Sequence, residues 1–288
     1  MSNGLRRRGL ANMMTFKGFK KTIRSALARR EIQKRNPARL CKSHGLDRQV
    51  IVSLTSYAAR FPMLHWTLRS LLRQSVAADQ TILWVSESDY LALTPEILDL
   101  QSYGLSIRTY PHNYKSYRKI IPVLEVFSDV YVVTADDDVP YWGTWLEELC
   151  VGMTKSRAAS VCHRAHRITI DKKSMPLRYS DWEMNLSHAA SGPLIFPTGV
   201  HGIMYDTLKL DPRVSEHEMF LNLAPSADDV WLYWMVRLAQ GVTVKVGKKR
   251  RVIEWPGSQV QNLRRDNIQG GGNDLAIRNM IAEFGFPA

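Results

Sequence analysis

Short apolar runs alternate along the chain with longer segments in which apolar residues recur every three or four positions. The longer period predicts a helix with one buried face, whereas an unbroken run of four to eight apolar residues favours a buried strand. On this basis the sequence predicts strands at residues 50–54, 81–86, 105–110 and 130–135. It predicts helices after Pro62 and at residues 94–103, 120–127, 141–153 and 228–240.

The order of these elements indicates the fold class. Strands that alternate with helices are typical of an α/β protein with a mostly parallel central sheet and flanking helices. In Rossmann-like sheets of this kind, ligands bind beyond the carboxyl ends of the strands. We therefore expect the functional site at that edge.

Three consecutive aspartates, Asp136, Asp137 and Asp138, follow the most hydrophobic of the predicted strands. Alternate side chains of an extended segment share a side, so Asp136 and Asp138 are expected to converge while Asp137 points away. Two carboxylates at such a short separation repel each other unless a cation lies between them. Ligation by oxygen atoms suits Mg²⁺ or Mn²⁺. The alternative is a solvated acidic turn, or an N-cap that Asp138 forms for the next helix.

A second acidic pair, Asp228 and Asp229, begins the predicted helix at residues 228–240. Asp229 lies three residues after Ser226, which is the spacing of a capping box and gives one aspartate a structural explanation. The other aspartate has no such explanation. A carboxylate at the mouth of a cleft can act as a general base toward a hydroxyl group, and either Asp228 or Asp229 fits that role.

Between the two acidic motifs, Gly199 and Gly202 flank His201. Glycine permits a ligand to approach the backbone closely, so His201 is a candidate ligand contact or metal ligand. A loop histidine without a catalytic role is the equal alternative. His163 and His166 also have a spacing that metals can use, but no further Cys or His cluster completes a site, which favours a structural or acceptor-side role.

The net charge of +12 is carried entirely by the first 48 residues, which hold fourteen Lys and Arg residues against Glu31 and Asp47. We therefore expect a basic tail at residues 1–48 and a neutral domain at residues 49–288. Apolar residues recur in the tail with a loosely helical spacing, and a basic amphipathic helix can bind an anionic membrane surface. The alternatives are a flexible solubilising tail and a nucleic-acid-binding arm.

Three widely spaced cysteines fit neither a disulfide framework nor a metal site built from Cys pairs. No apolar run reaches the roughly 20 residues that span a bilayer, and the first residues lack the apolar centre of a secretory signal. We therefore expect a cytoplasmic protein that lies peripherally on the inner face of the cell membrane.

A family resemblance lies in six segments that occur in the order IVSLTSYAAR, LHWTLRSLLRQS, ILWVSE, YKSYRKIIPVLEVFSDVYVVTADDDV, PTGVHGIMY and LAPSADDVWLYWM. Together they resemble GT-A glycosyltransferases of the family 2 type, in particular bacterial capsule and lipopolysaccharide enzymes. The resemblance covers about residues 49–247, and the DDD and ADD motifs are its most specific parts. It implies a donor-binding half at about residues 49–140 and an acceptor-side half at about residues 141–288.

The resemblance also implies a role for each motif. Asp136 and Asp138 match the DxD motif that holds Mn²⁺ or Mg²⁺ on the donor diphosphate, with His201 as a further candidate ligand. Asp228 or Asp229 matches the catalytic base of inverting members. Donor contacts are expected at Thr55, Ser56, Tyr57, Arg60, Glu87, Lys115, Lys119, Asp136 and Asp137. Acceptor contacts are expected at Thr198, Gly199, His201 and Gly202.

The sequence therefore predicts a glycosyltransferase that moves a sugar from a nucleotide-diphosphate sugar, with a UDP-sugar as the expected donor, to a glycan or lipid-linked acceptor in surface polysaccharide biosynthesis. An inverting reaction with an aspartate as general base is expected. A retaining transferase and a nucleotidyltransferase that use the same DxD site remain alternatives. A nucleic-acid-binding protein is the alternative from another class, although the neutral domain has no basic stripe and no known nucleic-acid motif, so we expect no nucleic-acid partner.

Overall fold

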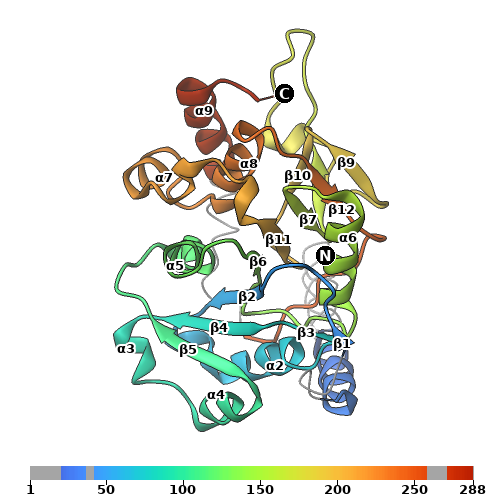
Figure 1. Cartoon of the computed structure of the whole chain (residues 1–288), viewed down its shortest axis with the longest axis vertical. Helices are drawn as coiled ribbons and strands as arrows, with labels where there is room; N and C mark the ends of the chain where they lie inside the picture. The colour runs from blue at the N-terminus through green and yellow to red at the C-terminus, as the bar shows by residue number, and fades with distance from the viewer. Residues whose placement is uncertain (1–20, 37–41, 258–270, 288) are drawn as a thin grey trace, which may run out of the picture.

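The computed structural model describes residues 21–36, 42–257 and 271–287. An eight-stranded sheet runs through the centre of the molecule, with helices on both of its faces (Figure 1). Its strands lie in the order β5 (Leu105–Thr109), β4 (Gln80–Val85), β2 (Val50–Thr55), β6 (Tyr131–Thr134), β11 (Ile203–Asp206), β7 (Ser160–Cys162), β12 (Thr243–Lys245) and β9 (Ala190–Gly192).

The sheet is mostly parallel, as the sequence predicted. Strands β5, β4, β2 and β6 run parallel to one another, and β7 and β12 follow the same direction. Strand β11 is antiparallel to both β6 and β7, and β9 is antiparallel to β12. Two smaller pairs are formed by β1 (Lys42–Ser43) with β3 (Val76–Ala77) and by β8 (Ala165–Arg167) with β10 (Ile195–Pro197).

Both faces of the sheet are buried. In β2, Val50, Val52 and Leu54 face one core while Ile51 faces the other, which is why the strand reads as an unbroken apolar run. The first core contains residues of α2 (Phe61–Leu71), α4 (Pro95–Leu98) and α6 (Trp145–Ser156). The second contains residues of α5 (Ile121–Val126), α7 (His217–Leu223), α8 (Asp228–Leu238) and α9 (Gly272–Phe284).

The four predicted strands are confirmed as β2, β4, β5 and β6, with bounds that differ by one residue at most at either end. The predicted helix at residues 94–103 is divided into α4 and a 3₁₀ helix at Asp99–Tyr103, and Gly104 ends it with a φ of +100°. A further short helix, α3 (Glu87–Tyr90), follows β4.

The alternative that Asp138 caps a helix beginning at Tyr141 is wrong. Helix α6 begins at Trp145, with Thr144 at its N-cap position. The preceding residues are held outside a helix by α2, because the Thr67 hydroxyl donates to the carbonyl of Val139 and the Tyr141 N–H donates to the hydroxyl of Ser70.

Residues 21–34 of the predicted tail form a helix that packs on the body of the protein, drawn in deep blue in Figure 1. Ile32 is fully buried, and the Arg35 guanidinium donates to the carbonyl of Tyr141 at 2.8 Å. Arg29 lies over the rings of Trp66 and Trp255, at 5.4 and 5.9 Å from their centroids. The predicted tail therefore includes a segment that is docked on the domain.

Other apolar residues of the predicted amphipathic tail have different outcomes. Ile23 and Leu27 are exposed on the docked helix. Met13, Met14, Phe16 and Phe19 lie outside the described residues. None of the helices in the described part of the chain is both long enough and apolar enough to cross a membrane.

Candidate active site

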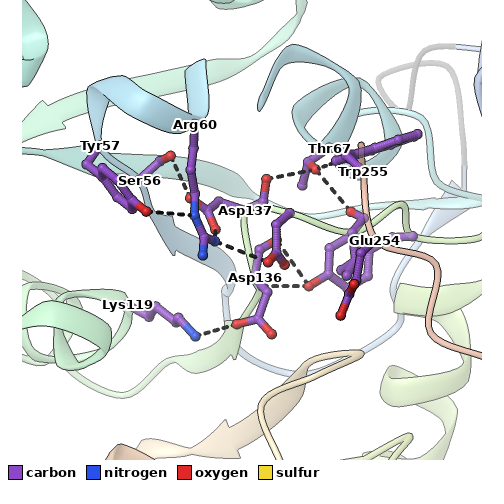
Figure 2. A network of polar contacts seen from close by, with 12 residues as sticks. Ser56, Tyr57, Arg60, Thr67, Lys119, Asp136, Asp137, Glu254 and Trp255 are labelled. Carbon is purple, nitrogen blue, oxygen red and sulfur yellow. Dashed lines mark hydrogen bonds and ion pairs between the residues drawn. The ribbon is translucent and has the colours of Figure 1, made fainter. Parts of the chain in front are cut away.

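The aspartate triplet follows β6 at the carboxyl edge of the parallel strands, and its middle member points into the protein. The Asp137 side chain is only 8% exposed and accepts a hydrogen bond of 2.6 Å from the hydroxyl of Ser56. Arg60 forms an ion pair with Asp137 (Figure 2) and a second one of 3.3 Å with Asp138. Ser56 and Arg60, two predicted donor contacts, thus fix the triplet from the end of β2.

Asp136 points away from Asp137 toward Lys119, which ends the 3₁₀ helix at Lys115–Lys119 (Figure 2). The Lys119 Nζ lies 2.5 Å from Asp136 Oδ1, and the backbone N–H of Asp136 donates to the Tyr141 hydroxyl at 2.6 Å. Burial disfavours both charges, but each stabilises the other, so the pKa of Asp136 is lowered and that of Lys119 is raised. Lys119 is thus a fixed cation beside the triplet.

The second acidic motif meets the glycine loop at the start of α8. Both carboxylate oxygens of Asp229 accept from the backbone N–H of Gly199, each at 3.1 Å. The predicted capping box is wrong, since Ala227 is the N-cap residue and no side chain caps the helix there. Asp229 instead bonds across to the loop that precedes β11. Burial, reinforced by the negative charge of Asp228, raises the pKa of Asp229 to about 8.

Gly199 lies where the two acidic motifs approach each other. A Cβ atom built on Gly199 would lie 3.3 Å from Asp229 Oδ1, and 3.9 Å from both Asp136 Oδ1 and Lys119 Nζ. Segments from three distant parts of the sequence therefore place two carboxylates and an ammonium group around one small volume. Glycine keeps that volume free of a side chain.

The remainder of the glycine loop is tightly held. His201 and Gly202 have φ values of +76° and +82°, and the His201 carbonyl accepts from Trp145 Nε1 at 2.6 Å. Burial and the nearby Arg164 lower the pKa of the His201 imidazole to about 4, so it is neutral at neutral pH. Thr198 is buried and accepts from Arg164 at 2.6 Å.

The residues present fit a hard divalent cation in charge and in ligand type. Five carboxylates, at Asp136, Asp137, Asp138, Asp228 and Asp229, lie around the cations Lys119 and Arg60, and carboxylate oxygen suits Mg²⁺ or Mn²⁺. Within the described residues, however, no three His, Cys, Asp or Glu side chains are grouped closely enough to hold a metal ion alone. His201 as a ligand therefore stays a prediction.

Several predicted donor contacts lie apart from this cluster. Lys115 and Glu87 are exposed at the surface, and neither has an ion pair with another described residue. The Thr55 hydroxyl donates to the carbonyl of Trp84 at 2.9 Å, and the ring of Tyr57 lies under the Arg60 guanidinium at 5.4 Å. Their contacts with a donor stay predictions.

His163 and His166 are buried and have partners in the protein. A ring nitrogen of His163 lies 3.0 Å from the carbonyl of Trp145, and His166 Nδ1 accepts from the N–H of Asn185 at 2.7 Å. Burial lowers the pKa of His163 to about 4 and that of His166 to about 3. These contacts favour the structural role among the two that the sequence left open.

Three residues that support the triplet were not identified from the sequence. Trp255 donates through its backbone N–H to the carbonyl of Asp138 at 3.0 Å and through Nε1 to the Thr67 hydroxyl at 2.7 Å. Thr67 in turn donates to the carbonyl of Asp137 (Figure 2), and the Tyr141 hydroxyl accepts from the N–H of Asp136. No local pattern marks these positions, because each contact joins segments that are distant in sequence.

Comparisons with known proteins give no family assignment. No protein-family model matches the chain, and no curated protein matches its sequence. Similar solved structures include mannosyltransferase PcManGT from Pyrobaculum calidifontis in complex with GDP-Man and Mn²⁺, at 13% identity and a TM-score of 0.35, over 54% of this chain and 46% of that one. The chain thus spans about half the length of that protein.

A second similar structure is 4-diphosphocytidyl-2C-methyl-D-erythritol synthase from Anaerococcus prevotii. It is 15% identical, with a TM-score of 0.42, and the match covers 79% of this chain and 96% of that one. Both TM-scores lie below 0.5.

Proposed function

We propose that the protein is a metal-dependent glycosyltransferase that transfers a sugar from a nucleotide-diphosphate donor with inversion. The observation that carries this proposal is the convergence of Asp136, Lys119 and Asp229 around Gly199. Transfer with inversion needs positive charge beside the leaving diphosphate and a base beside the attacking hydroxyl. Here both kinds of group flank the same small volume.

Asp229 is assigned as the general base in preference to Asp228. Its carboxylate is fixed by the Gly199 N–H and faces the space beside Asp136, whereas the sequence left the choice open. Its raised pKa means that it retains basicity near neutral pH, which suits proton removal from a hydroxyl group. The glycine loop at Thr198–Gly202 then contacts the acceptor.

Asp136 and Asp138 would hold the divalent ion, which supplies positive charge to the leaving diphosphate when it is bound. The further ligands would come from the diphosphate and water. Lys119 and Arg60 orient the two carboxylates and add fixed positive charge, and Ser56 and Tyr57 border the donor side. The donor nucleotide is proposed to be uridine diphosphate.

The cellular setting proposed is the inner face of the cell membrane, where the enzyme takes part in surface polysaccharide biosynthesis. The support is the basic N-terminal region, since each Lys or Arg near an anionic surface contributes about 1 kcal/mol to binding. The family 2 resemblance remains a prediction from the sequence motifs.

The test of this function measures nucleoside diphosphate release by the full chain with a panel of nucleotide-sugars and sugar acceptors, and the anomeric configuration of the product by NMR. Asp229→Asn is expected to lower turnover at least about a hundredfold with donor affinity retained, as for loss of a general base. Asp228→Asn is the matched control and is expected to keep most of the turnover.

Each other outcome identifies a different reaction. Retained configuration indicates a retaining transferase, and release of pyrophosphate indicates a nucleotidyltransferase. Equal turnover of both Asn variants and the wild type rejects Asp229 as the base. EDTA is expected to abolish transfer and Mn²⁺ or Mg²⁺ to restore it, and the same turnover in chelator rejects the metal site.

A further inference from the structure

A cavity of about 460 Å³ opens between three segments that are far apart in sequence. One wall is the docked helix at residues 21–34, the second is the loop at residues 140–142, and the third is the segment at residues 250–253. His201 also lines it, so the cavity borders the acceptor side of the candidate active site. Nothing in the proposed transfer mechanism uses its other walls.

The cavity has an excess of positive charge. Its lining includes Arg24, Arg35, Arg250 and Arg251, and Glu31 is the one acidic residue among them. The Glu31 carboxylate forms an ion pair with Arg35, which donates to it through both Nε and Nη2. Glu31 therefore offsets Arg35 and leaves the other three arginines.

The remaining arginines differ in what they contact. Arg250 forms an ion pair of 3.1 Å with Glu148 and stacks on the ring of Trp142 at 4.1 Å. Arg24 and Arg251 form no ion pair with any described residue, and the nearby Glu254 is paired with Lys21. Two guanidinium groups, on two different walls of the cavity, are thus available to an anion.

The cavity also has apolar surface next to these cations. Leu27 is 60% exposed at its rim, and Trp142 and Ile253 contribute to its lining. An exposed leucine beside unpaired arginines suits a ligand that joins an apolar part to an anionic group. Guanidinium groups bind phosphate through paired N–H donors, which favours phosphate as that anion.

We propose that this cavity binds the phosphate group of an amphiphilic phosphate ester, with Arg24 and Arg251 as its cationic contacts and Leu27 beside its apolar part. Because His201 lies on the shared wall, the ester is placed to present the acceptor sugar to Asp229. The phosphate site follows from the cavity alone, whereas naming its ligand as the acceptor rests on the proposed transferase function.

The test measures octyl phosphate binding to the full chain by titration calorimetry, with no nucleotide-sugar present. Arg24→Gln and Arg251→Gln are expected to weaken binding at least about tenfold each. Arg30→Gln and Lys248→Gln are the matched controls, because both residues are exposed and neither lines the cavity. Uncharged octyl glucoside is expected not to bind measurably, and thermal unfolding checks that all variants are folded.

A second arm separates the two sources of such a phosphate. Vesicles of phosphatidylglycerol, with phosphatidylcholine as the control, report whether the same variants lose binding to a lipid surface. If Arg24→Gln and Arg251→Gln lose binding to octyl phosphate only, the ligand is a freely diffusing ester. If they lose binding to vesicles only, the ligand is a lipid headgroup in the bilayer. The proposal is overturned if the cavity variants match Arg30→Gln and Lys248→Gln in both arms.

The outcome is independent of the transfer assay. Octyl phosphate binding that depends on Arg24 and Arg251 establishes the phosphate site even if no nucleotide-sugar supports turnover. Conversely, sugar transfer without octyl phosphate binding supports the transferase function and rejects the phosphate site.

Discussion

Three consecutive aspartates have three different environments in this protein. Asp137 is buried against Ser56 and Arg60, Asp136 is paired with Lys119 beside the Gly199 loop, and Asp138 shares Arg60 with Asp137. The alternation of side chains in an extended segment predicted that Asp137 would diverge from Asp136. It did not predict which cation each carboxylate meets, because Arg60 and Lys119 come from other elements.

His166 gives a prediction about acid stability. Its pKa falls from the ordinary 6.5 to about 3, chiefly because it is buried, so the folded protein keeps it neutral while the unfolded chain takes up a proton. Its contribution to stability is complete above pH 6.5 and is lost as the pH falls toward 3. Between pH 6.5 and 5 the free energy of unfolding should fall by about 2 kcal/mol from this residue alone.

His166→Asn tests this, because an amide oxygen can still accept the Asn185 N–H but does not titrate. Urea unfolding at pH 7 and pH 5 should show a loss of stability smaller than the wild-type loss by about 2 kcal/mol. The exposed His188, changed to Asn, serves as the control and should behave as the wild type does. The explanation fails if the two variants have the same pH dependence.

At the level of elements, the strands and most helix starts were predictable from the sequence, but the start of α6 was not. A strand buried on both faces is an unbroken apolar run whose ends are visible in the sequence. The start of α6 depends instead on side chains of α2 and of the loop after it. The Ser70 hydroxyl accepts a hydrogen bond from the N–H of Tyr141, and the Gln74 side-chain oxygen accepts one from the N–H of Leu146. Such contacts cannot be deduced from a local pattern.

The loop before β11 allows a steric prediction. Gly202 has a φ of +82°, and an added Cβ would lie 2.6 Å from the Trp145 ring, whereas Gly104 has a φ of +100° and open space around it. Gly104→Ala should therefore cost about 1–2 kcal/mol through backbone strain alone. Gly202→Ala adds overpacking of about 1–3 kcal/mol.

Urea unfolding of the two alanine variants measures the difference directly. Gly202→Ala should be the less stable by at least about 1 kcal/mol, and Trp145 fluorescence should report the shifted ring. Equal stabilities would mean that the Trp145 side chain yields without cost and that the loop is not packed as described.

For the whole molecule, the charge distribution of the sequence suggested a tail separate from the domain, but helix 21–34 is docked on it. Ile32 is fully buried while Leu27 is 60% exposed on the same helix. Ile32→Ala should therefore lower the free energy of unfolding by about 3 kcal/mol. Leu27→Ala should change it by no more than about 0.5 kcal/mol.

Thermal and urea unfolding of the full chain with these two variants test the docking. A single transition that shifts only with Ile32→Ala shows that the helix unfolds with the domain. If neither variant shifts the transition, the helix contributes nothing to the stability of the domain. The periodicity of the tail predicted a helix, but not its partners, because they lie in distant segments, and Trp255, under Arg29, is more than 200 residues away.

The contacts of Trp255 have a consequence for how the protein is made. Trp255 closes the aspartate loop through Thr67, 188 residues earlier, and its neighbour Glu254 pairs with Lys21, 233 residues earlier. On the ribosome, the aspartates leave the exit tunnel more than a hundred residues before their support does. The loop can therefore be completed only after Trp255 has been translated and has left the tunnel, and until then the three aspartates lack their final packing.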